Sequence, residues 1–359
     1  MSELYNTSFI KPFVRYLVNY NEIKTLLVCR SVSKLFKEVI YNEPLPNRQF
    51  IVKTLVQGMG LMRITKHIRL KFPWASTFAN KQLHKFNNNL SSLDLNFVSS
   101  IYDEDIKYMR VLSELNLQNT NVITDEGIQA LTSLTSLSLC NSNNITNKGI
   151  SRLRNLKRLD LGVSGGRITS QGLSKLTSLT DLNLWKNTRI TNVGLISLTN
   201  LANLNICDNI TITDDGISHL MSLRSLDMSG SKITNKGIIS LTNLTSLSIT
   251  YNQHITDEAL SHLICLTSLN IGGINLITDE GLSHMISLRK LYLYNNPRIT
   301  NRGLIFLTGL TELDISNDEN ITNEGLVPLI NLTTLRLDDN FNIKTDLLPE
   351  RINIIYRGH

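Results

Sequence analysis

The chain has 359 residues, of which 41% are hydrophobic but only 6% aromatic, so a folded core must be built mainly from aliphatic side chains. No run approaches the ~18 apolar residues that a membrane-spanning helix needs, and the first 20 residues lack the basic flank and apolar stretch of a secretory signal. The four cysteines form no CxxC pair, which favours a reducing compartment. We therefore expect a cytoplasmic or nuclear protein that does not contact membranes.

The net charge of +6 is distributed unevenly along the chain. Residues 1–90 carry 14 Lys and Arg against 4 Asp and Glu, whereas the remainder carries 22 against 26. The two regions therefore present different electrostatic surfaces, which predicts different partners.

The first 48 residues are expected to form short helices, over residues 9–18, from Asn21 onward and over residues 32–40. The stretch from Leu26 to Phe36 resembles the second half of an F-box. The opening Leu-Pro of that family is absent, with Phe9 and Ile10 in its place, and Asn21 stands where a leucine is usual. The positions that match the family in register are Leu17, Leu26, Leu27, Arg30, Val32, Ser33, Lys34 and Phe36.

This resemblance implies that residues 1–48 dock on the Skp-type adaptor of a cullin-RING ubiquitin ligase. The adaptor-binding side chains would then be Leu17, Leu26, Leu27, Val32 and Phe36. The alternative is that these residues form a small helical cap, which shields the apolar face of the first repeat.

Residues 49–89 are expected to be a linker and an irregular first repeat. Seven basic residues and no acidic one lie between Lys53 and Lys85. They could form a nucleic-acid patch. However, apolar residues such as Ile64, Ile68 and Leu70 alternate with them, which favours a repeat with a solvated basic edge. We therefore expect no nucleic-acid partner.

A repeat of about 22 residues covers positions 90–347. Each copy contains L-x-x-L-x-L, as from Leu134 to Leu139, followed by a word such as Ile145-Thr-Asn-Lys-Gly. The L-x-L part has the period of a strand, the Thr is a suitable helix N-cap, and the residues after it suffice for about one helical turn. The clear words begin at Ile123, Ile145, Ile168, Ile190, Ile212, Ile233, Ile255, Ile277, Ile299 and Ile321.

The repeat resembles the leucine-rich-repeat family. One coil cannot bury its own apolar face, so the coils must stack. The resemblance implies an α/β fold, a right-handed solenoid with a parallel concave sheet and short convex helices. Residues 348–359 would be a C-terminal cap or tail.

No nucleophile elbow, phosphate-binding loop or HExxH motif occurs, so we expect neither an enzyme nor a metal or other cofactor. His219, His262 and His284 share one repeat position, but the repeat places no carboxylate or thiol beside them, and they are interpreted as surface variation. The pair Gly272-Gly273 is interpreted as turn residues.

Residues between and just after the strand leucines should be exposed on the concave face. Exposed aromatics there are typical energetic anchors of protein interfaces. The alternative is that Tyr292 and Tyr294 merely cover neighbouring strands. We predict substrate-binding roles for Trp185, Asp208, Asp227, Tyr251, Tyr292 and Tyr294. The acidic residues of this face are Asp94, Glu114, Asp160, Asp181, Asp208, Asp227, Glu312, Asp314, Asp338 and Asp339.

Together, the two resemblances predict the substrate receptor of an SCF-type ubiquitin ligase. The F-box-like region would bind the adaptor, and the concave face of the repeats would recruit a protein for ubiquitination. The alternative is a stand-alone scaffold or inhibitor without a link to a ligase.

Overall fold

A computed structural model describes residues 50–51, 68–71, 90–163, 167–273 and 275–356. The F-box-like region of residues 1–48, with its five predicted adaptor-binding side chains, lies outside these residues. The chain divides into two compact units. Unit 1 comprises residues 1–160 and 165–168, and unit 2 comprises residues 161–164 and 169–359.

The described residues of unit 1 form six strands, each paired in parallel with the next along the chain. Short α-helices connect the later strands. The strands are β1 (Phe50–Ile51), β2 (Ile68–Lys71), β3 (Leu90–Asp94), β4 (Glu114–Asn116), β5 (Ser136–Ser138) and β6 (Arg158–Asp160). The helices are α5 (Asp103–Ile106), α6 (Asp125–Ile128) and α7 (Asn147–Ile150).

In the part of unit 2 that the structure describes, nine parallel strands follow one another in chain order. These are β7 (Asp181–Asn183), β8 (Asn203–Asn205), β9 (Ser225–Asp227), β10 (Ser246–Ser248), β11 (Ser268–Asn270), β12 (Lys290–Tyr292), β13 (Glu312–Asp314), β14 (Thr334–Arg336) and β15 (Asn353–Ile355). The last strand lies in the segment predicted as a cap, and it pairs with β14.

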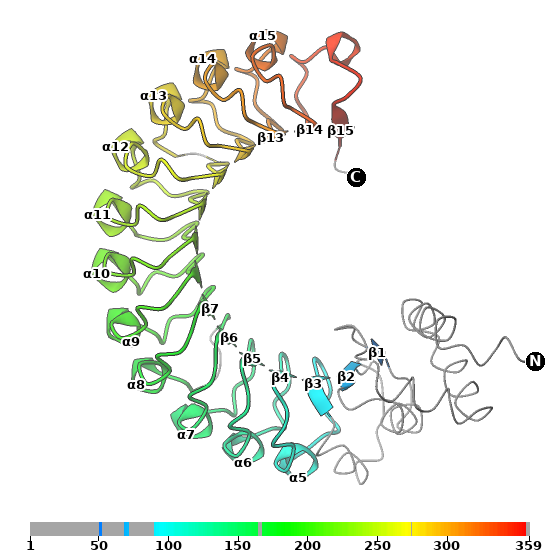
Figure 1. Ribbon diagram of the computed structural model, residues 1–359, viewed down its shortest axis with the longest axis vertical. Helices are drawn as coiled ribbons and strands as arrows, with labels where there is room; N and C mark the ends of the chain where they lie inside the picture. Colours follow the sequence, from blue (N-terminus) through cyan, green and yellow to red (C-terminus); the bar gives the residue numbers. More distant parts are fainter. Residues whose placement is uncertain (1–49, 52–67, 72–89, 164–166, 274, 357–359) are drawn as a thin grey trace, which may run out of the picture. The chain divides into compact units, whose positions relative to one another are not determined.

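The helices of unit 2 each follow a Thr of the repeat. They are α8 (Ser170–Leu173), α9 (Asn192–Leu195), α10 (Asp214–Ile217), α11 (Asn235–Ile238), α12 (Asp257–Leu260), α13 (Asp279–Leu282), α14 (Asn301–Leu304) and α15 (Asn323–Leu326), with a 3-10 helix η3 at Thr345–Leu347. Within unit 2 the strands line the inner side of a curved stack and the helices its outer side (Figure 1). No helix among the described residues is long and apolar enough to cross a bilayer.

The L-x-L pattern sets the strand register as predicted. Leu226 of β9 lies between Leu204 of β8 and Leu247 of β10, and all three are buried. The leucine and isoleucine positions of successive coils thus form continuous apolar rows between strands and helices. This explains why coils of about 22 residues, too short to bury their own apolar faces, fold as a stack.

Thr occupies the N-cap position of α6–α15, as predicted, and its hydroxyl accepts a backbone N–H in α6, α7, α13 and α14. The helix starts also show a further link between coils. The backbone N–H of Glu126 donates to the hydroxyl of Thr124, its N-cap. The Asp125 carboxylate in turn accepts from the backbone N–H and the hydroxyl of Thr146 in the next coil, at 2.8 and 2.6 Å. The aspartates at these helix starts therefore join consecutive coils, in addition to complementing the helix dipole.

One residue at each strand-end turn adopts the left-handed backbone conformation, with φ between 48° and 75°. Asn, Asp and Gly, which tolerate this conformation, occupy most of these positions. The next residue in the chain is often a buried Asn, such as Asn187, whose amide donates to Leu161 O of the preceding coil at 2.8 Å. This amide ladder satisfies carbonyl groups that would otherwise be buried without partners.

Candidate protein-binding surface

The side chains that alternate with the buried leucines in β7–β15, together with the turn residues after each strand, form the surface that we call the concave face. All six predicted substrate-binding residues lie on it and belong to unit 2. They do not form one site. Trp185 and Asp208 follow β7 and β8, whereas Tyr251 and Tyr294 follow β10 and β12.

Trp185, Lys186 and Asp208 form the first group, which we call the tryptophan cluster. The Lys186 Nζ lies 4.9 Å from the centroid of the Trp185 ring and 3.7 Å from Asp208 Oδ2. The indole is 37% exposed. The Asp208 carboxylate therefore forms an ion pair with Lys186 on this face.

Tyr251, Tyr294 and the pair Gly272-Gly273 form the second group, the tyrosine cluster. A Cβ on Gly272 would lie 2.3 Å from Cε1 of Tyr294, and one on Gly273 would lie 2.5 Å from Cε1 of Tyr251. The two rings, from the coils on either side, thus lie against the glycines of the coil between them. Gly273 also has φ +75°, which glycine adopts without strain.

Sequence reasoning missed this role of the glycine pair, which was interpreted only as a turn. A usable signal was present, because Gly273 follows Tyr251 by 22 residues and Gly272 precedes Tyr294 by 22. One repeat length separates each ring from its glycine, so neighbouring coils must bring them together.

Tyr292 belongs to a charged network on β12, β13 and β14. Glu312 accepts from Lys290 Nζ at 3.1 Å and from Arg336 at 3.2 Å, and the Arg336 guanidinium lies 5.8 Å from the Tyr292 ring centroid. Burial raises the pKa of the Tyr292 hydroxyl, and the nearby Glu312 raises this pKa further. Tyr292 is therefore a half-buried member of an ion-pair network, and it contacts strands beyond its own.

Three aspartates turn toward the backbone of their own strand ends. Asp227 Oδ1 accepts from the backbone N–H and the hydroxyl of Ser229, at 3.1 and 2.7 Å. Asp94 and Asp314 were predicted to be exposed, and this is wrong, because both are buried. Each accepts from the backbone N–H two residues later, which draws the carboxylate into the turn.

Among the described residues, no group of three or more His, Cys, Asp or Glu side chains is placed to hold a metal ion. The thiol of Cys207 lies beside the tryptophan cluster, and its pKa is raised to about 11, first by burial and then by Asp227 and Asp208. This thiol is therefore protonated near neutral pH and is a poor nucleophile.

Comparisons with known proteins agree with the repeat architecture. The model of the Leucine Rich repeat family matches residues 108–132, 175–198, 219–242 and 240–263. No curated protein matches the sequence.

Solved structures share the fold. An internalin of Listeria monocytogenes is 26% identical with a TM-score of 0.52, and the match covers 71% of this chain and 83% of the internalin. A leucine-rich-repeat protein of Leptospira interrogans is 24% identical with a TM-score of 0.59, covering 90% and 86%. TLR13, solved in complex with ssRNA13, is 20% identical with a TM-score of 0.59, covering 86% and 52%. The repeats of this chain are therefore leucine-rich repeats, stacked as a solenoid.

Proposed function

We propose that this chain recruits a protein on the concave face of unit 2 and acts as the substrate receptor of an SCF-type ubiquitin ligase. The observation that carries the recruiting role is the exposure of Tyr251. Its side chain is 59% exposed and its backbone has φ 53°, a conformation that costs a residue other than glycine about 1 kcal/mol. Most other coils place Asn, Asp or Gly at this position, so the fold does not require a tyrosine there.

The tryptophan cluster supports the same proposal. Trp185 is a large aromatic within a polar surround, and Trp and Tyr are the side chains that most often carry binding energy at interfaces. Lys186, next to it, also has φ 53°. Two separate aromatic groups on one face suit an extended protein surface better than a small molecule.

Nucleic acid is a less suitable partner for this face. Its cations Lys186, Lys290 and Arg336 each lie within 4 Å of an Asp or Glu side chain. Such pairing, together with the surplus of carboxylates, opposes the approach of a phosphate backbone. The likeness to TLR13 concerns the fold alone.

The link to a ligase rests on the sequence of the N-terminal region. Leu26, Leu27, Val32 and Phe36 match the F-box pattern in register, and Leu17 matches the end of its first helix. In this proposal these side chains bind a Skp-type adaptor, no cofactor or membrane takes part, and the protein works in the cytoplasm or the nucleus. Without adaptor binding, the chain would be a stand-alone scaffold or inhibitor.

Co-purification of the full chain with a Skp-type adaptor tests the ligase link. We expect the double variant Leu27→Asp and Val32→Asp to lose the adaptor, because a buried charge without a partner costs several kcal/mol. Ile264→Asp with Ile286→Asp is the matched control, since both isoleucines are exposed on the outer side. If both double variants fold and retain the adaptor equally, the ligase link is wrong, and the stand-alone scaffold remains as the proposed function.

The recruiting role is tested once proximity labelling has identified a partner. We expect Trp185→Ala, and separately Tyr292→Ala with Tyr294→Ala, to weaken partner affinity by ~2 kcal/mol or more. Lys175→Ala and His262→Ala change exposed outer positions and serve as controls. Loss of affinity in the controls, with none in the aromatic variants, would move the binding surface to the outer side.

A further inference from the structure

The last strand of the described sheet, β15, is paired along one edge only. The Asn353 N–H donates to Thr333 O of the preceding coil at 2.7 Å. Ile355 O accepts from the N–H of Leu337 at 3.4 Å. Successive residues of a strand direct their main-chain groups to opposite edges, so the N–H and C=O of Ile354 face away from β14. Among the described residues, no strand pairs with this second edge.

The side chains of β15 show the same incomplete packing. Ile354 is in register with Leu335 of β14, which is buried, as is the corresponding leucine of each strand from β7 to β13. Ile354 is only half-buried, because no further coil of the described residues lies against it. The terminal coils of solenoids usually present a polar face to water. The last coil of this solenoid instead presents the edge of an apolar row.

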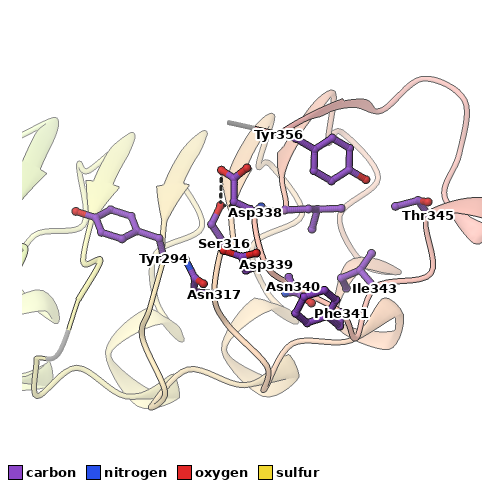
Figure 2. Close-up of a pocket in the computed structure, with 11 residues that line it drawn as sticks. Tyr294, Ser316, Asn317, Asp338, Asp339, Asn340, Phe341, Ile343, Thr345 and Tyr356 are labelled. Atoms are coloured by element: carbon purple, nitrogen blue, oxygen red, sulfur yellow. Dashed lines mark hydrogen bonds between the residues drawn. The ribbon is translucent and has the colours of Figure 1, made fainter. Parts of the chain in front are cut away.

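A pocket of about 680 Å³ beside β15 also reaches the apolar rows, because Leu337 and Ile343 contribute to its lining. Ile343 is 7% exposed, whereas Ile321, its equivalent in the preceding coil, is fully buried. Figure 2 shows Phe341 and Ile343 on one side of the pocket and Tyr356 on the other. Phe341 and Tyr356 are 84% and 60% exposed. The apolar surface of the last coil therefore extends from the strand into the preceding turn.

The same apolar surface continues into the outer segment of the last coil. Leu347, in the 3-10 helix η3, is 65% exposed. Large exposed apolar patches mark interaction sites in soluble proteins. We call the surface that these side chains form the end face; it comprises Phe341, Leu347, Ile352, Ile354 and Tyr356.

The edge of β15 lacks the features that keep exposed strands apart. Proteins protect such edges with charged side chains, proline or bulges, and none of these occurs in Ile352–Tyr356. The charges that precede the edge, from residue 344 onward, are all exposed and comprise two cations and two anions, namely Lys344, Arg351, Asp346 and Glu350. Because both signs are present in equal number, the same surface of a second copy can approach without net repulsion.

We propose that two copies of this chain associate through the end face, with their β15 strands paired antiparallel about a two-fold axis at Ile354. The N–H and C=O of each Ile354 then bond to those of the other copy, which is the hydrogen-bonded pair of an antiparallel ladder. Tyr356 of each copy lies opposite Ile352 of the other, and such aromatic and β-branched pairs stabilise sheets. A contact of this kind uses the same surface on both copies and closes at two.

The exposure of Leu347 fits the same axis. A two-fold axis perpendicular to the sheet places strand beside strand and outer segment beside outer segment, so Leu347 of one copy meets the η3 segment of the other. The contact therefore buries apolar side chains at both the strand and the outer segment. Trp185 and Tyr251 lie outside the end face, so this proposal does not depend on the recruiting role.

Sedimentation equilibrium of the full chain over a roughly hundredfold range of concentration tests the proposal. We expect the weight-average mass to rise from that of one chain toward that of two. Ile354→Pro removes the N–H that faces the second copy, and proline is accepted where the N–H of an edge strand points outward. This change should weaken the dimer about tenfold or more. Ile354→Val keeps the N–H and is the matched control, with an affinity within about twofold of the wild type.

Leu347→Asp is a second variant, which leaves β15 intact. It places like charges on the two facing outer segments and should weaken the dimer about tenfold or more. Val193→Asp, on the outer helix α9 and 62% exposed, is its control and should not alter the dimer. Far-UV circular dichroism checks the folding of each variant, and if Ile354→Pro does not fold, Leu347→Asp decides.

Three results would overturn the proposal. The first is the mass of one chain at every concentration. The second is a dimer that both Ile354→Pro and Leu347→Asp leave unchanged, or that Val193→Asp weakens equally. The third is growth beyond two copies, because a head-to-tail contact produces open assemblies and a two-fold contact does not.

Discussion

Asp318 occupies the position of the amide ladder that holds Asn187 and Asn340 in other coils. The amide of Asn340 donates to Ile315 O at 3.1 Å and to Asp318 O at 2.6 Å. Asp318 is only 1% exposed, and its Oδ2 has no hydrogen-bond partner among the described residues. An asparagine at this position would donate its amide N–H to a neighbouring carbonyl, whereas an ionised carboxylate can only accept and finds no donor there. Asp318→Asn should therefore restore the amide ladder.

The magnitude follows from the pKa of the Asp318 carboxyl. Burial is the main cause that raises this pKa from 3.8 to about 6, whereas the N–H of Asn320 lowers it. Two pKa units correspond to about 3 kcal/mol. Between about pH 4 and pH 6 the folded chain holds a proton that the unfolded chain has released, so stability falls as the pH rises through this window. Asp318→Asn removes this loss.

Urea unfolding followed by far-UV circular dichroism at pH 4.5 and pH 8 measures the effect. We expect Asp318→Asn to raise the free energy of unfolding by about 3 kcal/mol at pH 8, and by about 1 kcal/mol or less at pH 4.5, where the wild-type carboxyl is mostly protonated. Glu319→Gln, at the exposed neighbouring position, is the control and should have little effect at either pH. A gain that is equal at both pH values would refute the reasoning.

Three further changes separate folding from binding. Leu226→Ala should lower the free energy of unfolding by ~2–5 kcal/mol in urea titrations, because a cavity opens in the stacked core; an unchanged midpoint would mean that the strand register is wrong. Tyr251→Asn should change the free energy of unfolding by less than about 1 kcal/mol, because Asn relieves the strain of the left-handed backbone while the packing of the ring is lost. The same change should weaken partner affinity roughly tenfold in titration calorimetry. Gly272→Ala should push the Tyr294 ring aside and weaken the same affinity with little change in melting temperature; unaltered binding would show that the position of this ring is unimportant.

The sequence alone was sufficient for the repeat architecture. Strand, turn and helix recur at a spacing of about 22 residues, and L-x-L specifies both the strand period and the buried face. The N-cap role of Thr124 also followed from the sequence, because capping depends on residues two or three positions away. Because the same strand pattern and helix cap recur in every coil, the coils can bury their apolar faces only by stacking on one another.

The concave face shows what the tertiary structure alone decided. Trp185 and Tyr251 are exposed as predicted, but nothing local indicated that Lys186 would bridge Trp185 and Asp208. Likewise, the burial of Asp94 and Asp314 depends on the rotamer that turns each carboxylate into the strand-end turn. An Asp side chain can point either to solvent or to its own backbone, and the sequence alone does not determine which of the two conformations it adopts.

Contacts between coils mark the limit of sequence reasoning for this chain. Tyr294 meets Gly272, Asp125 meets Thr146, and Asp318 replaces an amide whose acceptor lies in the preceding coil. In each case the partner lies about one repeat away along the chain but only ~4.8 Å away in the stack. The period of the sequence determined that such neighbours would meet, and only the stacked structure determined which atoms touch, because that depends on side-chain rotamers packed against adjacent coils.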